Sequence, residues 1–316
     1  MEPSWLGTAR VLFVAGKGGV GSSTVAAAVS LLAARNGADV LLASVDGKPG
    51  LGPLLGGQPL TKDEQLLRAL SAGGGRVRGR SIPPDQAFGD YLELRGVGGL
   101  LRRAASAASL DMVAASTPGL EHLLVLGKIK ELERTKAADL IVVDAPPAGH
   151  AAPFIRSASA LQEVVASGPV RQQADEVAEM LADPQRAQAL LVTLAEETPV
   201  NELIELACDV DERLGLALAP LVVNACWPDR ADLALTPAAA AKRSGITLSV
   251  ADKAALTMSS RYGWARLQVQ REQLARLDEL LPLPRVVLPK ITAPRLTPEH
   301  LERLAEELAV EPERPR

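Results

Sequence analysis

The sequence predicts an α/β fold in which a mostly parallel sheet carries helices on both faces. Residues 10–35 combine an apolar run, a glycine-rich loop and an alanine- and leucine-rich run, the pattern of a strand, a loop and a helix. A second apolar run follows at 39–45, and strand-like runs recur at 138–143, 189–194 and 216–223. Strands that are separated by helices pair in parallel through right-handed crossovers, which indicates the fold class.

Composition limits the number of domains and the classes of partner. The chain has 316 residues, 47% of them hydrophobic and 23% charged, which is enough to bury a full core. We predict one domain over 1–316 with a helical insertion at about 83–135. A net charge of −4 gives no electrostatic footprint for nucleic acid, so no nucleic-acid partner is expected. We interpret the basic cluster Arg76–Arg80 as a solvated face.

The first residues and the cysteines bear on the cellular compartment. The N-terminus lacks the basic flank and apolar core of a leader, and no uncharged run reaches about 18 residues. We therefore expect a cytoplasmic protein that does not insert directly into a membrane. Cys208 and Cys226 have neither metal-ligand nor disulfide spacing, and because both lie in apolar runs we expect both to be buried.

The other elements follow from local signals along the chain. Asn36 and Gly37 predict the end of the first helix, and the Gly- and Pro-rich residues 47–53 predict an irregular loop. Thr-Pro pairs predict helix starts, with threonine as the N-cap and proline at the first helical position. These pairs begin at Thr117, Thr198, Thr236 and Thr297. Further helices are expected at 198–211, 248–280 and 298–309, and a last short strand is expected at 285–288.

The glycine-rich loop predicts a site for phosphate. Glycines at 16, 18, 19 and 21 allow backbone N–H groups to point inward at the positive end of the next helix. The usual phosphate-binding loop is G-x-x-x-x-G-K-[ST], with its lysine on the β- and γ-phosphates and its hydroxyl on Mg²⁺. Here Ser22 stands where that lysine belongs, Ser23 keeps the hydroxyl, and a lysine lies early in the loop, at Lys17.

The order Gly-Lys-Gly-Gly-Val-Gly at 16–21 resembles the deviant-Walker P-loop ATPases, which include arsenite-pump (ArsA-type), tail-anchored-protein-targeting, partitioning and septum-site ATPases. The chain is most similar to arsenite-pump-like, anion-transporting ATPase-like proteins of actinobacterial type, which form heterodimers of related subunits. This resemblance implies a P-loop NTPase fold, a homologous subunit in a hetero- or homodimer, and binding of ATP or ADP with Mg²⁺. It also implies a catalytic role for Lys17 in trans, on a phosphate bound by the partner.

The resemblance assigns roles to single residues. It implies phosphate binding by the loop residues Gly16, Lys17, Gly18, Gly19, Val20, Gly21, Ser22, Ser23 and Thr24. The family's second switch, D-T-A-P-T-G-H, is matched by Asp144, Ala145, Pro146, Gly149 and His150. Asn224 ends a predicted strand at the position where the family's asparagine contacts adenine.

A magnesium site is predicted at the same edge of the sheet. Mg²⁺ bound with ATP takes a loop hydroxyl, one or two carboxylates and several waters. Ser23 supplies the hydroxyl, and Asp46 and Asp144 end buried strands and supply carboxylates, directly or through water. A strand-end aspartate is often only a turn former, but two of them together with a loop hydroxyl on one edge favour a metal site.

Two groups needed for hydrolysis are missing. Ser22 replaces the P-loop lysine, and the loss of one preorganised donor commonly costs on the order of 10²–10³ in rate. The first switch of the arsenite-pump and targeting ATPases is D-P-A-x-x-L-x-D, and its last aspartate orients water. The resemblance places Pro53 there, which can neither accept nor donate a proton. Lys48 is either a solvated loop lysine, the simpler interpretation, or a replacement for the lost charge.

Three functions are compatible with these residues. The first is an ATP-binding, hydrolysis-impaired subunit that pairs with an active homologue and couples nucleotide state to a client or transport partner. The second is an active ATPase that drives anion transport or membrane-protein targeting, in which Lys17 or Lys48 supplies the positive charge of the missing P-loop lysine. The third is a non-enzymatic, nucleotide-gated chaperone that binds clients through the insertion.

Overall fold

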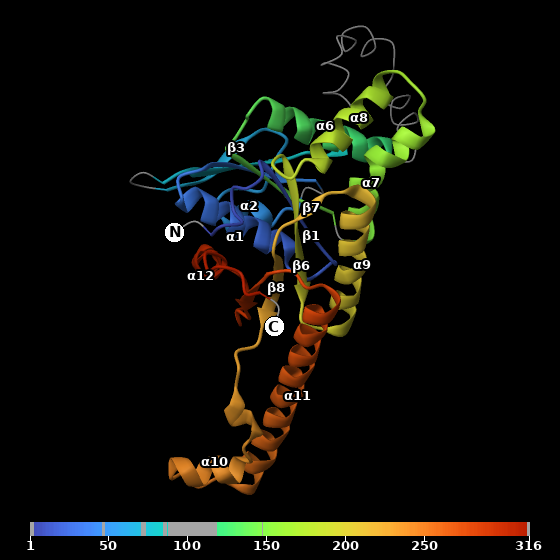
Figure 1. Cartoon of the computed structure of the whole chain (residues 1–316). Helices are drawn as coiled ribbons and strands as arrows, with labels where there is room; N and C mark the ends of the chain where they lie inside the picture. Colours follow the sequence, from blue (N-terminus) through green and yellow to red (C-terminus); the bar gives the residue numbers. More distant parts are fainter. Residues whose placement is uncertain are drawn as a thin grey trace.

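The computed structural model describes residues 3–45, 48–70, 74–84, 87, 119–146 and 148–314. Its strands are β1 (Val11–Gly16), β2 (Asp39–Ser44), β3 (Gln65–Ala69), β4 (Arg76–Ser81), β5 (Leu140–Asp144), β6 (Ala187–Leu194), β7 (Ala217–Leu218), β8 (Leu221–Cys226) and β9 (Arg285–Pro289). Within these residues they form one sheet in the order β3-β4-β2-β5-β1-β6-β8-β9, with β7 paired to β6 (Figure 1). Its strand pairs are parallel apart from β3–β4, which confirms the predicted sheet.

Helices cover both faces of this sheet. They are α1 (Ser22–Arg35), α2 (Leu51–Leu54), α6 (Leu120–Arg134), α7 (Ala148–Val164), α8 (Pro169–Ala182), α9 (Glu197–Leu214), α10 (Pro237–Ser244), α11 (Val250–Leu280) and α12 (Pro298–Leu308), with a 3₁₀ turn η1 (Ala231–Ala234). Alternate residues of β1 enter two separate cores. Phe13 belongs to the core that includes side chains of α6, α7, α8 and α9, whereas Val14 belongs to the core that includes side chains of α1, α2 and α12. Figure 1 shows α10 and the first part of α11 extending away from the sheet.

Most predicted helix ends are confirmed. The first helix ends at Arg35, and Gly37 follows with φ 99°, a conformation that suits glycine. Thr236 accepts a hydrogen bond from Ala239 N at 3.2 Å and so caps α10. Thr297 precedes Pro298, the first residue of α12. The long helix α11 spans most of the predicted 248–280.

Three local predictions need correction. Residues 51–54 form the one-turn helix α2, because Pro53 stands in a first turn, where the missing N–H has no helical acceptor. For the same reason α9 tolerates Pro199 and begins at Glu197, before the predicted start at Thr198. The predicted strand 216–223 is two strands, interrupted at Pro220, which has no N–H for the ladder.

Other predictions fall partly outside the described residues. The end of the predicted insertion is helical, as α6, but residues 88–118 lie outside the description, and so do Thr117 and Asp46. The division of the chain into one domain with an insertion stays a prediction. Cys226 is buried as expected, and burial raises the pKa of its thiol to about 12, whereas Cys208 is exposed on α9, contrary to expectation.

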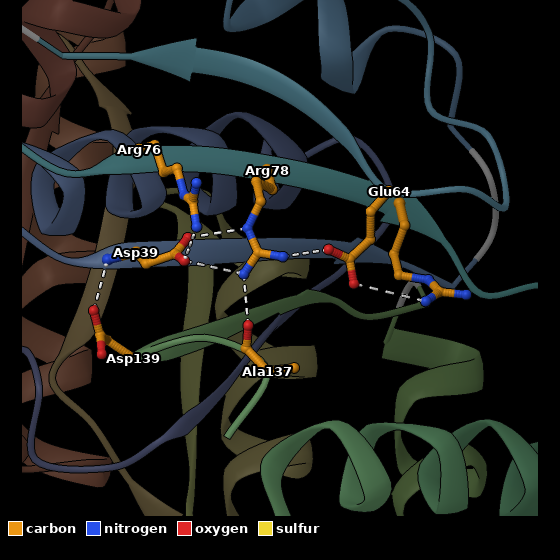
Figure 2. Close-up of polar contacts among 7 residues, drawn as sticks. Asp39, Glu64, Arg76, Arg78, Ala137 and Asp139 are labelled. Carbon is orange, nitrogen blue, oxygen red and sulfur yellow. Dashed lines mark hydrogen bonds and ion pairs between the residues drawn. The ribbon is translucent and has the colours of Figure 1, made fainter. Parts of the chain in front are cut away.

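One edge of the sheet is formed by two strands that the sequence does not predict. Residues 65–69 and 76–81, for which no strand is predicted, form β3 and β4, and β4 pairs in parallel with β2. Arg78 on β4 is ion-paired with Asp39 at 3.0 Å and with Glu64, and it donates to Ala137 O (Figure 2). Its side chain is 18% exposed and that of Arg80 is 17% exposed. The interpretation of this cluster as a solvated face is therefore wrong for both residues.

Candidate functional site

The loop between β1 and α1 has the backbone conformation that the glycine pattern predicts. Gly19 and Gly21 have φ of 89° and 88°, a region that side chains disfavour. A Cβ on Gly21 would lie 2.4 Å from Asn224 Nδ2, and one on Gly16 would lie 2.4 Å from Val192 O. Glycine is therefore required at these positions by backbone conformation or by close contact. Gly18 and Gly19 are exposed at the surface of the loop.

The loop leads into the N-terminus of α1 without a capping side chain. Gly21 is the N-cap, and Ser22, Ser23 and Thr24 are half-buried in the first turn. The N–H groups of a first turn have no acceptor within the helix, and the helix dipole makes this end positive. This geometry suits an anion. Phosphate binding by the individual loop residues stays a prediction.

Ser23 and Asp144 meet where α1 begins and β5 ends. Ser23 Oγ donates to the carboxylate of Asp144, at 3.1 Å from Oδ1 and 2.9 Å from Oδ2. Asp144 is 0% exposed. The structure thus brings these two candidate magnesium ligands into contact, and their binding of Mg²⁺ stays a prediction.

Lys48 reaches the same place from the segment between β2 and α2. Its Nζ lies 3.0 Å from Ser23 Oγ and 3.1 Å from both carboxylate oxygens of Asp144. The simpler interpretation of Lys48 as a solvated loop lysine is therefore wrong, because the ammonium neutralises a buried carboxylate. A buried charge is tolerated only when it is paired, which explains this position.

The donor set therefore fits Mg²⁺ only in part. A hydroxyl and a carboxylate are the oxygen ligands that Mg²⁺ prefers, and Ser23 and Asp144 provide them. The ammonium of Lys48, however, already contacts these oxygens, so the described arrangement holds one cation against them. Among the described residues no three His, Cys, Asp or Glu side chains gather in a way that could hold a metal ion.

Lys17 is paired within its own chain. Its Nζ lies 2.6 Å from Glu202 Oε1 on α9, and about a third of each side chain is exposed. The structure therefore turns Lys17 toward α9, and its action on a partner subunit stays a prediction.

Asn224 connects β8 to the loop. Its Nδ2 donates to Val20 O at 2.8 Å, and its Oδ1 accepts from Ala225 N at 2.8 Å. Ala225 has φ 52°, which is uncommon for a residue with a side chain. Asn224 thus holds the glycine loop in place, and its predicted contact with adenine is untested.

The predicted second switch follows β5 directly. Asp144 ends that strand and Pro146 is buried beside it. Gly149 is exposed in the first turn of α7, and the side chain of His150 lies outside the description. The roles of Pro146, Gly149 and His150 as a switch stay predictions.

A cavity of about 480 Å³ opens beside these groups. Its lining comes from α1, from 48–54 and from 295–298 at the start of α12, and consists of Ser23, Lys48, Gly50, Leu51, Pro53, Leu54, Arg295, Leu296, Thr297 and Pro298. Pro53 lines it, so no carboxylate stands at that position. Arg295 gives the cavity a second cationic residue, which the sequence analysis misses because only the Thr-Pro helix start after it carries a local signal.

Comparison with known proteins gives concordant matches. The sequence model of a family described as "Anion-transporting ATPase" matches residues 9–71. The chain is 34% identical over 311 residues to ATPase BagA of Mycobacterium tuberculosis, covering 92% of this chain and 90% of that protein. It is 26% identical over 165 residues to ATPase GET3 of Paracoccidioides lutzii, covering 50% of this chain and 46% of that protein. No helix in the described ranges is long and apolar enough to cross a bilayer.

Proposed function

This chain belongs to the anion-transporting ATPase family, and from that premise we propose that it is an ATP-binding subunit whose own hydrolysis is impaired. It pairs with a homologous, active subunit and couples its nucleotide state to a client or transport partner. The observation that carries the proposal is the glycine loop, whose backbone suits phosphate while Ser22 replaces its lysine. Pro53, which lines the adjacent cavity, aligns with the family's water-orienting aspartate, and proline cannot orient water for hydrolysis.

The ion pair of Lys17 is compatible with a role at a partner's site. Pairs as exposed as Lys17–Glu202 contribute little, typically up to about 1 kcal/mol, so the lysine can leave Glu202 at small cost. The backbone cradle of this chain then binds its own nucleotide, while Lys17 serves the active homologue. A triphosphate held without hydrolysis would keep the pair in one state.

The test combines calorimetry with turnover. We expect ATP to bind the purified chain with measurable heat, and ATP hydrolysis to stay near background. The double variant Ser22→Lys, Pro53→Asp restores both missing groups, and we expect it to raise turnover by on the order of 10²-fold or more. Lys62→Arg, at an exposed position away from the loop, is the control. Absence of any ATP binding by folded protein would refute the proposal.

One observation favours a second function, an active ATPase. Lys48 lies 3.0 Å from Ser23 Oγ, close enough to the start of α1 to supply the positive charge that Ser22 lacks. In this case the wild-type chain alone hydrolyses ATP, and Lys48→Met abolishes turnover while Lys62→Met leaves it unchanged. The chaperone alternative depends on the insertion, whose residues 88–118 the structure does not describe.

A further inference from the structure

The ammonium of Lys48 has an unusually complete set of oxygen neighbours. Ser23 Oγ lies at 3.0 Å, both oxygens of Asp144 at 3.1 Å, and the carbonyl oxygen of Ala145 at 3.5 Å. A hydroxyl, a carboxylate and a carbonyl are also the ligand types that hard cations take in proteins. The lysine thus occupies a cation position at the end of β5.

The backbone holds Lys48 in this position. Its N–H donates to Ser44 Oγ at 3.4 Å, at the end of β2, and its carbonyl accepts from Leu51 N at 3.3 Å, at the start of α2. The backbone N–H and C=O of Lys48 are therefore both hydrogen-bonded, one to β2 and the other to α2. Because Asp144 is fully buried, its charge needs a counter-charge, and Lys48 provides one from within the chain.

A divalent metal on the same oxygens would conflict with this arrangement. Mg²⁺ binds oxygen ligands at about 2.1 Å, so a metal on Ser23 Oγ would lie within about 5 Å of the ammonium that contacts the same atom. Two cations at that separation repel each other strongly in a partly buried site. Ser23 Oγ already accepts a hydrogen bond from Lys48, so the metal would also compete with the ammonium for the lone pairs of this oxygen.

We propose that Lys48 is a built-in cation that excludes Mg²⁺ from the Ser23–Asp144 oxygens, so that this chain binds ATP or ADP without needing the metal. The nucleotide part of this inference rests on the proposed function above. Lys48 also faces the cavity beside Ser23, together with Arg295, so the positive charge that Mg²⁺ would otherwise bring to the phosphates comes from side chains. In this chain, nucleotide binding is therefore uncoupled from the metal.

Calorimetry in the presence of excess Mg²⁺ or of EDTA tests the nucleotide part. We expect the Kd of wild type for ATP to differ by less than about threefold between the two buffers. In Lys48→Met the cation position is free, and we expect Mg²⁺ to tighten ATP binding by roughly tenfold or more. Lys48→Arg keeps the charge and should stay independent of the metal, and Lys62→Met is the control for removal of an exposed lysine.

Titration of Mn²⁺ without nucleotide, followed by electron paramagnetic resonance, tests the exclusion directly. We expect Lys48→Met to bind Mn²⁺ more tightly than wild type by about tenfold or more. Equal Mn²⁺ affinity of the two proteins, or tenfold tighter ATP binding by wild type in Mg²⁺ than in EDTA, would overturn the inference. The second result would leave the proposed function standing. Lack of ATP binding would refute that function, while the Mn²⁺ comparison would still decide whether Lys48 excludes the metal.

Discussion

Two ends of the sheet hold a carboxylate against a cation, and they do so differently. At the start of β2, Asp39 accepts hydrogen bonds from Arg76 and Arg78, both on the neighbouring strand β4 (Figure 2). At the end of β5, Asp144 contacts the ammonium of Lys48, on a short segment between two elements. One cluster is built from guanidinium forks on a strand, and the other from a single point charge on a connection.

The difference indicates which cluster can face a ligand. The planar forks of two arginines fix the geometry of the Asp39 cluster. The single point charge of Lys48 lies beside a cavity, so it can face a ligand there while it keeps a second cation away from Asp144. We therefore assign the Asp39 cluster to stability and the Asp144 cluster to ligand control.

The largest effect on stability is expected from Arg78→Met. This change leaves Asp39, Glu64 and the carbonyl of Ala137 without the guanidinium that they share, at a position only 18% exposed. Removal of the guanidinium that three oxygen-bearing groups of this half-buried cluster share should lower the free energy of unfolding by about 2–3 kcal/mol, measured by urea denaturation. Arg76→Met is the matched control, because that side chain is 56% exposed and should cost less. Equal losses would contradict the distinction.

A smaller loss of stability is expected from Lys48→Met in metal-free buffer. Asp144 loses its ammonium but keeps the hydrogen bond from Ser23, and because Lys48 itself lines the cavity, water can take over part of its role, so about 1–2 kcal/mol should be lost. Urea denaturation with EDTA measures this. A loss as large as that of Arg78→Met would mean that Lys48 is a fixed structural element, and the two ends of the sheet would then be equivalent.

The smallest effect is a dependence on pH. Hydrogen bonding from Arg76 first, and then from Arg78, holds the pKa of Asp39 below its ordinary value of 3.8, against the opposing effect of burial. Because the folded-state pKa is lowered, the contribution is complete above the ordinary pKa and is lost as pH falls through that value toward the lowered one. Solvent screening keeps this contribution to stability small.

Comparison of wild type with Asp39→Asn isolates this contribution from other carboxylates. We expect the variant to be less stable at neutral pH, and the difference in unfolding free energy to shrink below about pH 4. Asp63→Asn, at an exposed carboxylate close by in the sequence, serves as the control. A difference that stays constant down to pH 2 would show that the pKa of Asp39 is not lowered by folding.

Much of the fold could be predicted because its signals are local. Apolar runs predict β1, β2, β5, β6 and β9, and glycines or Thr-Pro pairs predict most helix ends. The first β-α loop was predictable for the same reason, since Gly19 and Gly21 adopt the backbone conformation that only glycine favours. The strands β3 and β4 were not, because the arginines that alternate along β4 mask its pattern.

The sequence by itself determined the glycine loop and most of the alternation of strands and helices, because these depend on residues that are neighbours in the chain, and the parallel pairing follows from that alternation. Only the tertiary structure decided where the charged side chains find partners. Lys48 and Asp144 are 96 residues apart, and Lys17 and Glu202 are 185 apart. Such pairs form only when strand packing brings distant segments together and a buried carboxylate must be neutralised, which no local pattern records.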